Sequence, residues 1–114
     1  MTFEEFKGRK LKFKAWDLEH RLLMRLNTIE CLKGELVKKN HILLQYTGLT
    51  DILGEEIYEM DVLIISLDKF VVYYNEAKFG WYYSTLEKRN PGMALTAPEA
   101  AKMKRFCSYY ELQR

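Results

Sequence analysis

The sequence has few of the residues that build metal centres. It contains two cysteines and two histidines in 114 residues. His20, His41 and Cys31 are isolated and do not have the spacing of zinc ligands. Cys31 and Cys107 are far apart in a chain without a secretory leader, so we expect reduced thiols. We expect no bound metal and no cofactor.

Sequence signals for membranes and for catalysis are also missing. No apolar run approaches the length that crosses a bilayer, and the first residues are not a basic then apolar leader. Ser66, Ser84 and Cys107 have no neighbouring base in a nucleophile motif, and no glycine-rich phosphate loop occurs. We therefore expect a soluble, intracellular protein with no membrane contact, no enzymatic activity and no small-molecule substrate.

What the sequence does contain suits one globular domain with an uneven charge distribution. Hydrophobic residues make up 48% and charged residues 30% of the chain, ordinary values for a folded domain. The net charge of +2 conceals a net charge of −5 over residues 41–61, against +3 over residues 1–14 and +3 over residues 84–114. Basic ends and an acidic middle favour contact between copies or with a partner.

The acidic middle also holds the clearest turn signals. His41 to Thr47 is apolar enough for a buried strand, and Gly48 permits a positive φ where that strand ends. Asp51 and Gly54 occupy the first and last positions of a type I turn, where the Asp side chain caps its own backbone. A second strand should begin near Asp61 and run through Ile65.

Most of the remaining chain also has strand patterns. Lys10, Lys12 and Lys14 alternate with apolar residues, which predicts a strand with one wet face over residues 9–16. The other predicted strands are 20–26, which pairs back on the first, 28–32 and 35–39 around a Lys33-Gly34 turn, 69–75, and 79–84 after a turn at 75–78.

The closing segment predicts a helix. Thr96 is a suitable N-cap, Pro98 falls in the first turn, and Glu99 is placed to complete a capping box. The helix should run from about Ala97 to Tyr109. The sequence therefore favours a mainly β (α+β) fold, a small and strongly bent antiparallel sheet over residues 1–89, with residues 90–114 as linker and carboxyl-terminal helix packed on it or on a partner.

Residues 45–62 read Gln-Tyr-Thr-Gly-Leu-Thr-Asp-Ile-Leu-Gly-Glu-Glu-Ile-Tyr-Glu-Met-Asp-Val. This linear motif resembles the YopX family of phage and prophage proteins. Lys12 to Asp17, Val71 to Tyr73 and Phe79 to Trp81 extend the likeness, and beyond Thr85 no further match is evident. The matching positions that we expect to be structural are Gln45, Tyr46, Thr47, Gly48, Leu49, Asp51, Gly54, Ile57, Tyr58 and Asp61. The resemblance implies a small SH3-like barrel in the carboxyl-terminal part of the family's fold, and a location in the cytoplasm of a bacterial host.

The chain departs from the family pattern at the turns. Met60 stands where the family usually has Gly, and its side chain disfavours a positive φ. Ile52 and Leu53 occupy a turn tip that is commonly polar in the family. Asp61 should cap a turn or pair with a basic residue of the sheet.

Two surfaces are candidates for binding. Exposed Ile52 and Leu53, flanked by Glu55, Glu56 and Glu59, predict a partner-binding surface, with a second copy or a host protein as the partner. The alternative is nucleic acid on Lys10, Lys12 and Lys14 with Trp16 for stacking, because alternate strand residues are about 6.6 Å apart, near the phosphate step of an extended strand. Those lysines could equally guard a strand edge. A third reading, from the phage context, is an inhibitor of a host defence or replication protein.

Overall fold

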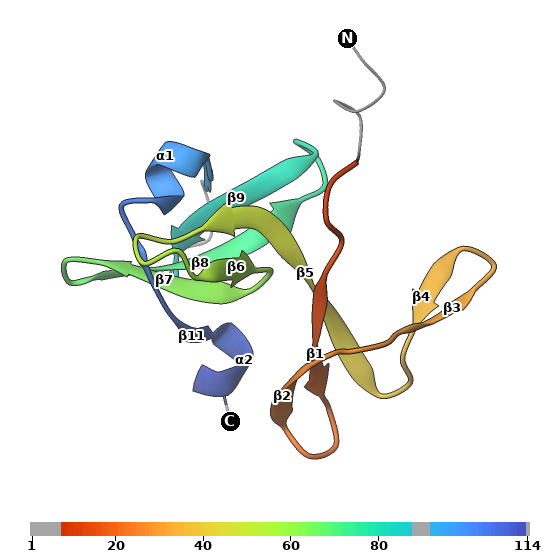
Figure 1. Cartoon of the computed structure of the whole chain (residues 1–114). Helices are drawn as coiled ribbons and strands as arrows, with labels where there is room; N and C mark the ends of the chain where they lie inside the picture. The colour runs from red at the N-terminus through yellow and green to blue at the C-terminus, as the bar shows by residue number, and fades with distance from the viewer. Residues whose placement is uncertain (1–7, 88–91, 114) are drawn as a thin grey trace, which may run out of the picture.

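The computed structural model describes residues 8–87 and 92–113 of the chain. Strands dominate this part (Figure 1). In chain order the elements are β1 (Phe13–Asp17), β2 (Leu22–Arg25), β3 (Glu30–Leu32), β4 (Glu35–Val37), β5 (His41–Thr50), β6 (Glu56–Tyr58), β7 (Asp61–Ile65), β8 (Asp68–Asn75), β9 (Gly80–Thr85), β10 (Met93–Ala94), α1 (Ala97–Ala100), β11 (Lys104–Ser108) and α2 (Tyr109–Leu112).

The strands form two antiparallel sheets and a separate hairpin. Five strands run in the order β10-β9-β8-β7-β11, four in the order β2-β1-β5-β6, and β3 pairs only with β4. The long strand β5 pairs with β1 through its first half and with β6 through its second. The sheets curl into an antiparallel half-barrel, which confirms the mainly β fold and the strongly bent sheet.

The core lies inside this curl. Its fully buried members include Ile57 on β6, Leu63 on β7 and Val72 on β8, and α1 adds Ala100. Burying such aliphatic side chains stabilises a fold by about 1.5–3 kcal/mol each. Val62 and Val71, which pair across β7 and β8, face the other way and are buried as well. The central strands are therefore covered on both faces.

Most of the predicted strands and turns are confirmed. β2 pairs back on β1, and β8 and β9 form the expected hairpin. Lys33 and Gly34 both have positive φ, 52° and 84°, which matches a tight two-residue hairpin turn. Gly48 has a φ of 87° at a β-bulge in β5. The sequence analysis missed β6, whose three residues lie within the predicted loop.

Met60 adopts the conformation that its side chain disfavours. Its φ is 67°, in the left-handed region that suits glycine. Both of its backbone groups are held: the N–H donates to the Val72 carbonyl and the carbonyl accepts from Tyr109 N–H, each at 2.7 Å. These two bonds, to β8 and to α2, fix the corner between β6 and β7 against the local preference.

The prediction of one helix from Ala97 to Tyr109 is wrong. The Thr96 cap is present, accepting from the Glu99 N–H, but α1 ends at Ala100. Residues Lys104–Ser108 instead form β11, which pairs with β7 and supplies the backbone partners that β7 would otherwise lack on that side. A different capping box, which the sequence did not predict, joins Ser108 and Glu111 at the start of α2. Tertiary pairing overrides the helical pattern here.

The last helix and the β3–β4 hairpin sit differently on the body. The α2 helix packs against β1, with the rings of Trp16 and Tyr110 stacked 5.6 Å apart. The hairpin projects away from both sheets (Figure 1). No helix among the described residues is long and apolar enough to span a bilayer.

Candidate binding groove

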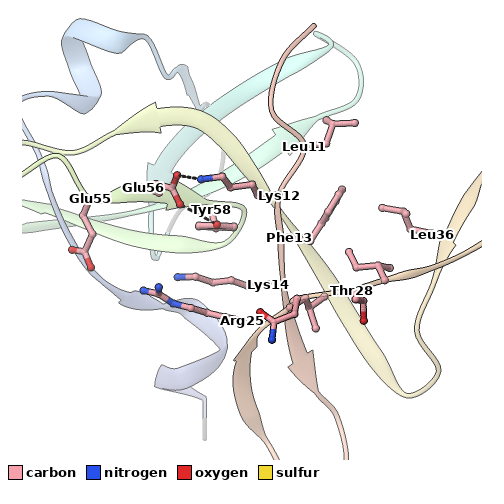
Figure 2. A pocket seen from close by; sticks show the side chains of 13 residues that line it. Leu11, Lys12, Phe13, Lys14, Arg25, Thr28, Leu36, Glu55, Glu56 and Tyr58 are labelled. Atoms are coloured by element: carbon pink, nitrogen blue, oxygen red, sulfur yellow. Dashed lines mark hydrogen bonds and ion pairs between the residues drawn. The ribbon is translucent and has the colours of Figure 1, made fainter. Parts of the chain in front are cut away.

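A groove of about 660 Å³ is bordered by β1, by β6 and by the end of the molecule that carries the β3–β4 hairpin. Figure 2 shows Lys12 and Lys14 pointing toward Glu55, Glu56 and Tyr58, with Leu36 on the opposite side. The groove is lined by Leu11, Lys12, Phe13, Lys14, Arg25, Leu26, Asn27, Thr28, Ile29, Leu36, Glu55, Glu56 and Tyr58. One wall is therefore charged and the other is largely apolar.

Lys12 joins the two sides of the charged wall. Its Nζ contacts Glu56 Oε2 at 2.5 Å and lies 5.5 Å from the centre of the Tyr46 ring. The hydrogen bond from Lys12 lowers the pKa of Glu56. Both side chains remain partly exposed, so this ion pair adds little stability and can exchange for contacts with a ligand.

Tyr58 and Lys14 form the inner part of the same wall. The Lys14 Nζ lies 4.5 Å from the centre of the Tyr58 ring, a cation–π contact. Burial, followed by repulsion from Arg105, lowers the pKa of Lys14. Burial and the neighbouring Glu56 raise the pKa of Tyr58 to about 12. The Lys14 ammonium group is therefore enclosed by neighbouring side chains and is not available as a free surface cation.

Behind this wall is a buried ion pair. Arg105 Nε on β11 donates to Asp61 Oδ2 on β7 at 2.9 Å, and the Asp61 side chain is 1% exposed. Asp61 also accepts from the Tyr58 N–H at 2.8 Å. Burial raises the pKa of Asp61, and the bonds from Arg105 and Tyr58 offset part of that effect. Both roles expected of Asp61, turn cap and ion pair, are confirmed.

Asp51 is a second buried carboxylate with a structural task. Its Oδ1 accepts from the N–H groups of Leu53 and Glu55, and its Oδ2 accepts from the N–H of Arg105 at 2.7 Å. Burial alone would raise the pKa of Asp51, but these three donors outweigh it and hold the pKa below 3.8. The turn at 51–54 is thereby tied to β11.

Other motif residues also serve the backbone. Thr47 Oγ1 donates to the Ile57 carbonyl at 2.8 Å and accepts from the Leu49 N–H, which closes the bulge at Gly48. The Tyr46 and Tyr58 rings lie 5.6 Å apart across β5 and β6. These contacts explain why the motif residues occur together: they build one corner of the half-barrel.

The structure brings together some predicted site residues and separates others. Glu55 and Glu56 share the groove with Lys12 and Lys14, whereas Glu59 lines a different hollow. Ile52 and Leu53 lie on the β5–β6 turn and are 59% and 71% exposed. The predicted partner-binding residues therefore do not form one surface.

The predicted open lysine face is corrected by the structure. Lys14 is 9% exposed and Trp16 is 4% exposed, because both lie where β1 is covered by neighbouring elements. Lys12 is paired with Glu56. Lys10 lies apart, beside Tyr46 and Gly48 in a shallow hollow of about 240 Å³.

Sequence reasoning missed Arg105 and Arg25. Arg105 falls within the segment from Ala97 to Tyr109 that the sequence predicts as a helix, and only its distant partner Asp61 indicates its role. The one sequence signal for a buried basic residue is the carboxylate of Asp61 beside the apolar run 62–65, because a buried carboxylate needs a basic partner. Arg25 lines the groove from β2, at a position that pairs with Lys14 on β1.

The groove offers both polar and apolar side chains to a ligand.

In residues 8–87 and 92–113 no three Asp, Glu, His or Cys side chains converge in a way that could hold a metal ion. Both cysteines are free, Cys31 on the exposed hairpin and Cys107 on β11. Burial raises the pKa of the Cys107 thiol, which disfavours the reactive thiolate.

Comparison with solved structures shows the same fold elsewhere. The crystal structure of protein EF1440 from Enterococcus faecalis superposes with a TM-score of 0.63 at 16% identity, covering 94% of this chain and 98% of that one. No curated protein matched this chain. The family model described as YopX protein matches residues 8–109, which extends the likeness past Thr85 and through β11. The chain belongs to the YopX protein family.

Proposed function

We propose that this protein is a non-enzymatic phage or prophage protein that binds a protein partner or a second copy of itself. The observation that carries the proposal is the exposure of apolar side chains on the β3–β4 hairpin and on the β5–β6 turn. The bacterial cytoplasm is the compartment that we propose for it. Inhibition of a host defence or replication protein would be one use of such binding.

The hairpin has little support from the rest of the molecule. All six residues of β3 and β4 are exposed. Leu32, Leu36 and Val37 are 54%, 41% and 37% exposed. An isolated two-stranded hairpin is marginal in water, and exposed apolar side chains favour contact sites. By the register, Leu32 and Val37 share one face of the hairpin, and Leu36 lies on the other face, which lines the groove. A partner that covers the hairpin would supply the missing packing.

Unlike the hairpin, the β5–β6 turn is tied to the rest of the molecule by hydrogen bonds. Asp51 fixes its backbone from inside, and the Ile52 N–H donates to the Met103 carbonyl at 2.9 Å. The backbone of Ile52 and Leu53 is therefore held in one conformation. A preorganised apolar tip loses little entropy on binding.

The proposal predicts that the double variant Ile52→Ser, Leu53→Ser weakens association at least about tenfold, which corresponds to loss of roughly 1.4 kcal/mol of binding free energy. Light scattering over a concentration series would measure self-association, and affinity capture from a host lysate would measure partner binding. Leu67→Ser is the matched control, because Leu67 is 97% exposed on the β7–β8 turn.

The Leu67→Ser control should behave like the unmodified protein in both assays. Thermal unfolding should show that all three proteins are equally folded, since the changed side chains are exposed. A protein that remains strictly monomeric and captures no partner would contradict the proposal.

Nucleic-acid binding is the second candidate, favoured by the exposed side chains of Arg9 and Lys10 beside Tyr46. It predicts salt-sensitive retention on a random oligonucleotide, because phosphate contacts release counterions. Lys10→Glu should weaken retention, because it places a negative charge beside Arg9 in this hollow. No retention at low salt would remove this candidate.

A further inference from the structure

A second hollow, of about 390 Å³, opens between the β8–β9 hairpin and the middle of β5. It is lined by Arg9, Gln45, Glu59, Tyr74, Glu76, Phe79, Gly80 and Trp81. Three of these residues are aromatic and two are carboxylates, while Arg9 is the one cation among them. The hollow is separate from the groove of Figure 2 and shares no lining residue with it.

The aromatic wall is built by the β8–β9 hairpin. Tyr74 and Trp81 stand opposite each other in the register, and their rings meet edge to face with centroids 5.2 Å apart. Trp81 packs against the core while Tyr74 is 41% exposed. Phe79, at the end of the turn, is 82% exposed. The aromatic wall is therefore held in place at Trp81 by packing against the core, and it is exposed to solvent at Phe79.

The half-buried carboxylate of Glu59 in this hollow has no basic partner within residues 8–87 and 92–113. Its one hydrogen bond among the described residues is from the Gln45 N–H at 3.4 Å, and no basic group of those residues lies within 4.0 Å of it. Burial raises the pKa of Glu59, and the Gln45 N–H offsets part of the shift. A cation placed here would relieve the unfavourable burial of the charge.

Aromatic faces and carboxylates together are the chemistry that recognises organic cations. A guanidinium or ammonium group gains from ring faces within about 6 Å and from charge-assisted hydrogen bonds to carboxylate oxygens. We propose that this hollow is a binding site for the positively charged side chain of an arginine or lysine on a partner protein. This inference rests on the proposed protein-binding function and names the partner chemistry that one site accepts.

The test is a titration with short capped peptides followed by NMR. An acetylated and amidated Gly-Arg-Gly peptide should shift the Trp81 indole and Gly80 amide signals, whereas the citrulline peptide, which has the same shape and no charge, should not. Glu59→Gln should weaken binding about 5- to 30-fold, the range expected for a partly desolvated ion pair. Tyr74→Ser should weaken it about 3- to 10-fold by removing a cation–π face.

Asp68→Asn is the matched control. Like Glu59→Gln it removes one carboxylate charge, but it lies at the end of β8 that is distant from Tyr74. It should leave the titration unchanged. Equal shifts with the citrulline peptide, equal binding by Glu59→Gln, or no shifts at all would overturn the inference. Spermidine binding without binding of the arginine peptide would also overturn it. A strict monomer in light scattering would remove self-association and leave this titration unaffected, so the two failures can be distinguished.

Discussion

Replacing Asp51 with asparagine is expected to lower the free energy of unfolding by about 2–4 kcal/mol. Each buried donor left without an acceptor costs roughly 1–3 kcal/mol. The asparagine oxygen can accept from Leu53 and Glu55 as Oδ1 does now, but its amide nitrogen would then face the Arg105 N–H, donor against donor. A substitution that is nearly isosteric should therefore be almost as harmful as Asp51→Ala.

Urea unfolding of both variants at neutral pH would measure this effect. The pH dependence gives a second reading. Since the pKa of Asp51 is lowered in the folded state, its stabilising effect is present above 3.8 and is lost as the pH falls through the folded pKa. The difference between the original protein and Asp51→Asn should thus shrink in acid.

The control for the Asp51 variants is Glu55→Gln, which changes an exposed carboxylate in the same turn and should shift stability by less than about 0.5 kcal/mol. Equal stability of Asp51→Asn and the unmodified protein would show that the three N–H bonds do not hold the turn.

Replacing Arg105 with methionine should destabilise the fold by about 3–5 kcal/mol, the usual result of breaking a buried ion pair from one side. Methionine retains the length of the side chain but leaves Asp61 buried and unpaired. Without Arg105, the folded-state pKa of Asp61 should rise further above its unfolded value. The variant should then be relatively more stable below the unfolded pKa and lose that advantage as the pH rises.

A double variant separates charge from packing. Asp61→Asn together with Arg105→Met removes both charges and retains an acceptor for the Tyr58 N–H, so it should recover much of the loss. Lys12→Met is the matched control, because it breaks an exposed pair with Glu56 and should cost less than about 1 kcal/mol. If Arg105→Met were as stable as Lys12→Met, the buried pair would have no structural role.

Local chemistry allowed much of the fold to be predicted. Gly48, Asp51 and the Lys33-Gly34 pair act within a few residues of themselves, and their turns are where the sequence analysis expected them. The alternating pattern of residues 69–75 likewise identifies β8. Such features depend on neighbours in sequence, which a single chain displays directly.

The errors arose where distant residues decide. Lys104 to Ser108 have a helical pattern but pair with β7, 40 to 47 residues earlier. Lys14 follows the strand alternation of a wet face, yet β5 and β2 flank it and Tyr58 covers it. Neither fact can be read from a window of local sequence, because each is set by the closure of the half-barrel.

The candidate site was predicted in its parts and missed as a whole. Glu56 and Lys12 were assigned to rival functions, protein binding and nucleic-acid binding, and the structure shows them in one ion pair. Ile52 and Leu53 were expected to be exposed, and they are. The aromatic hollow around Glu59 needed the register of β8 and β9, which brings Tyr74 beside Trp81.

Because β3 and β4 pair only with each other, the hairpin and the half-barrel can unfold as separate cooperative units. Because the hairpin bonds to neither sheet, residues 30–37 can open and close on their own timescale while the half-barrel stays intact. Amide exchange there would report the local equilibrium of an arm, and exchange in β7 and β8 would report global unfolding. Substitutions in the hairpin should therefore change the local exchange rates of residues 30–37 and leave the free energy of global unfolding nearly unchanged.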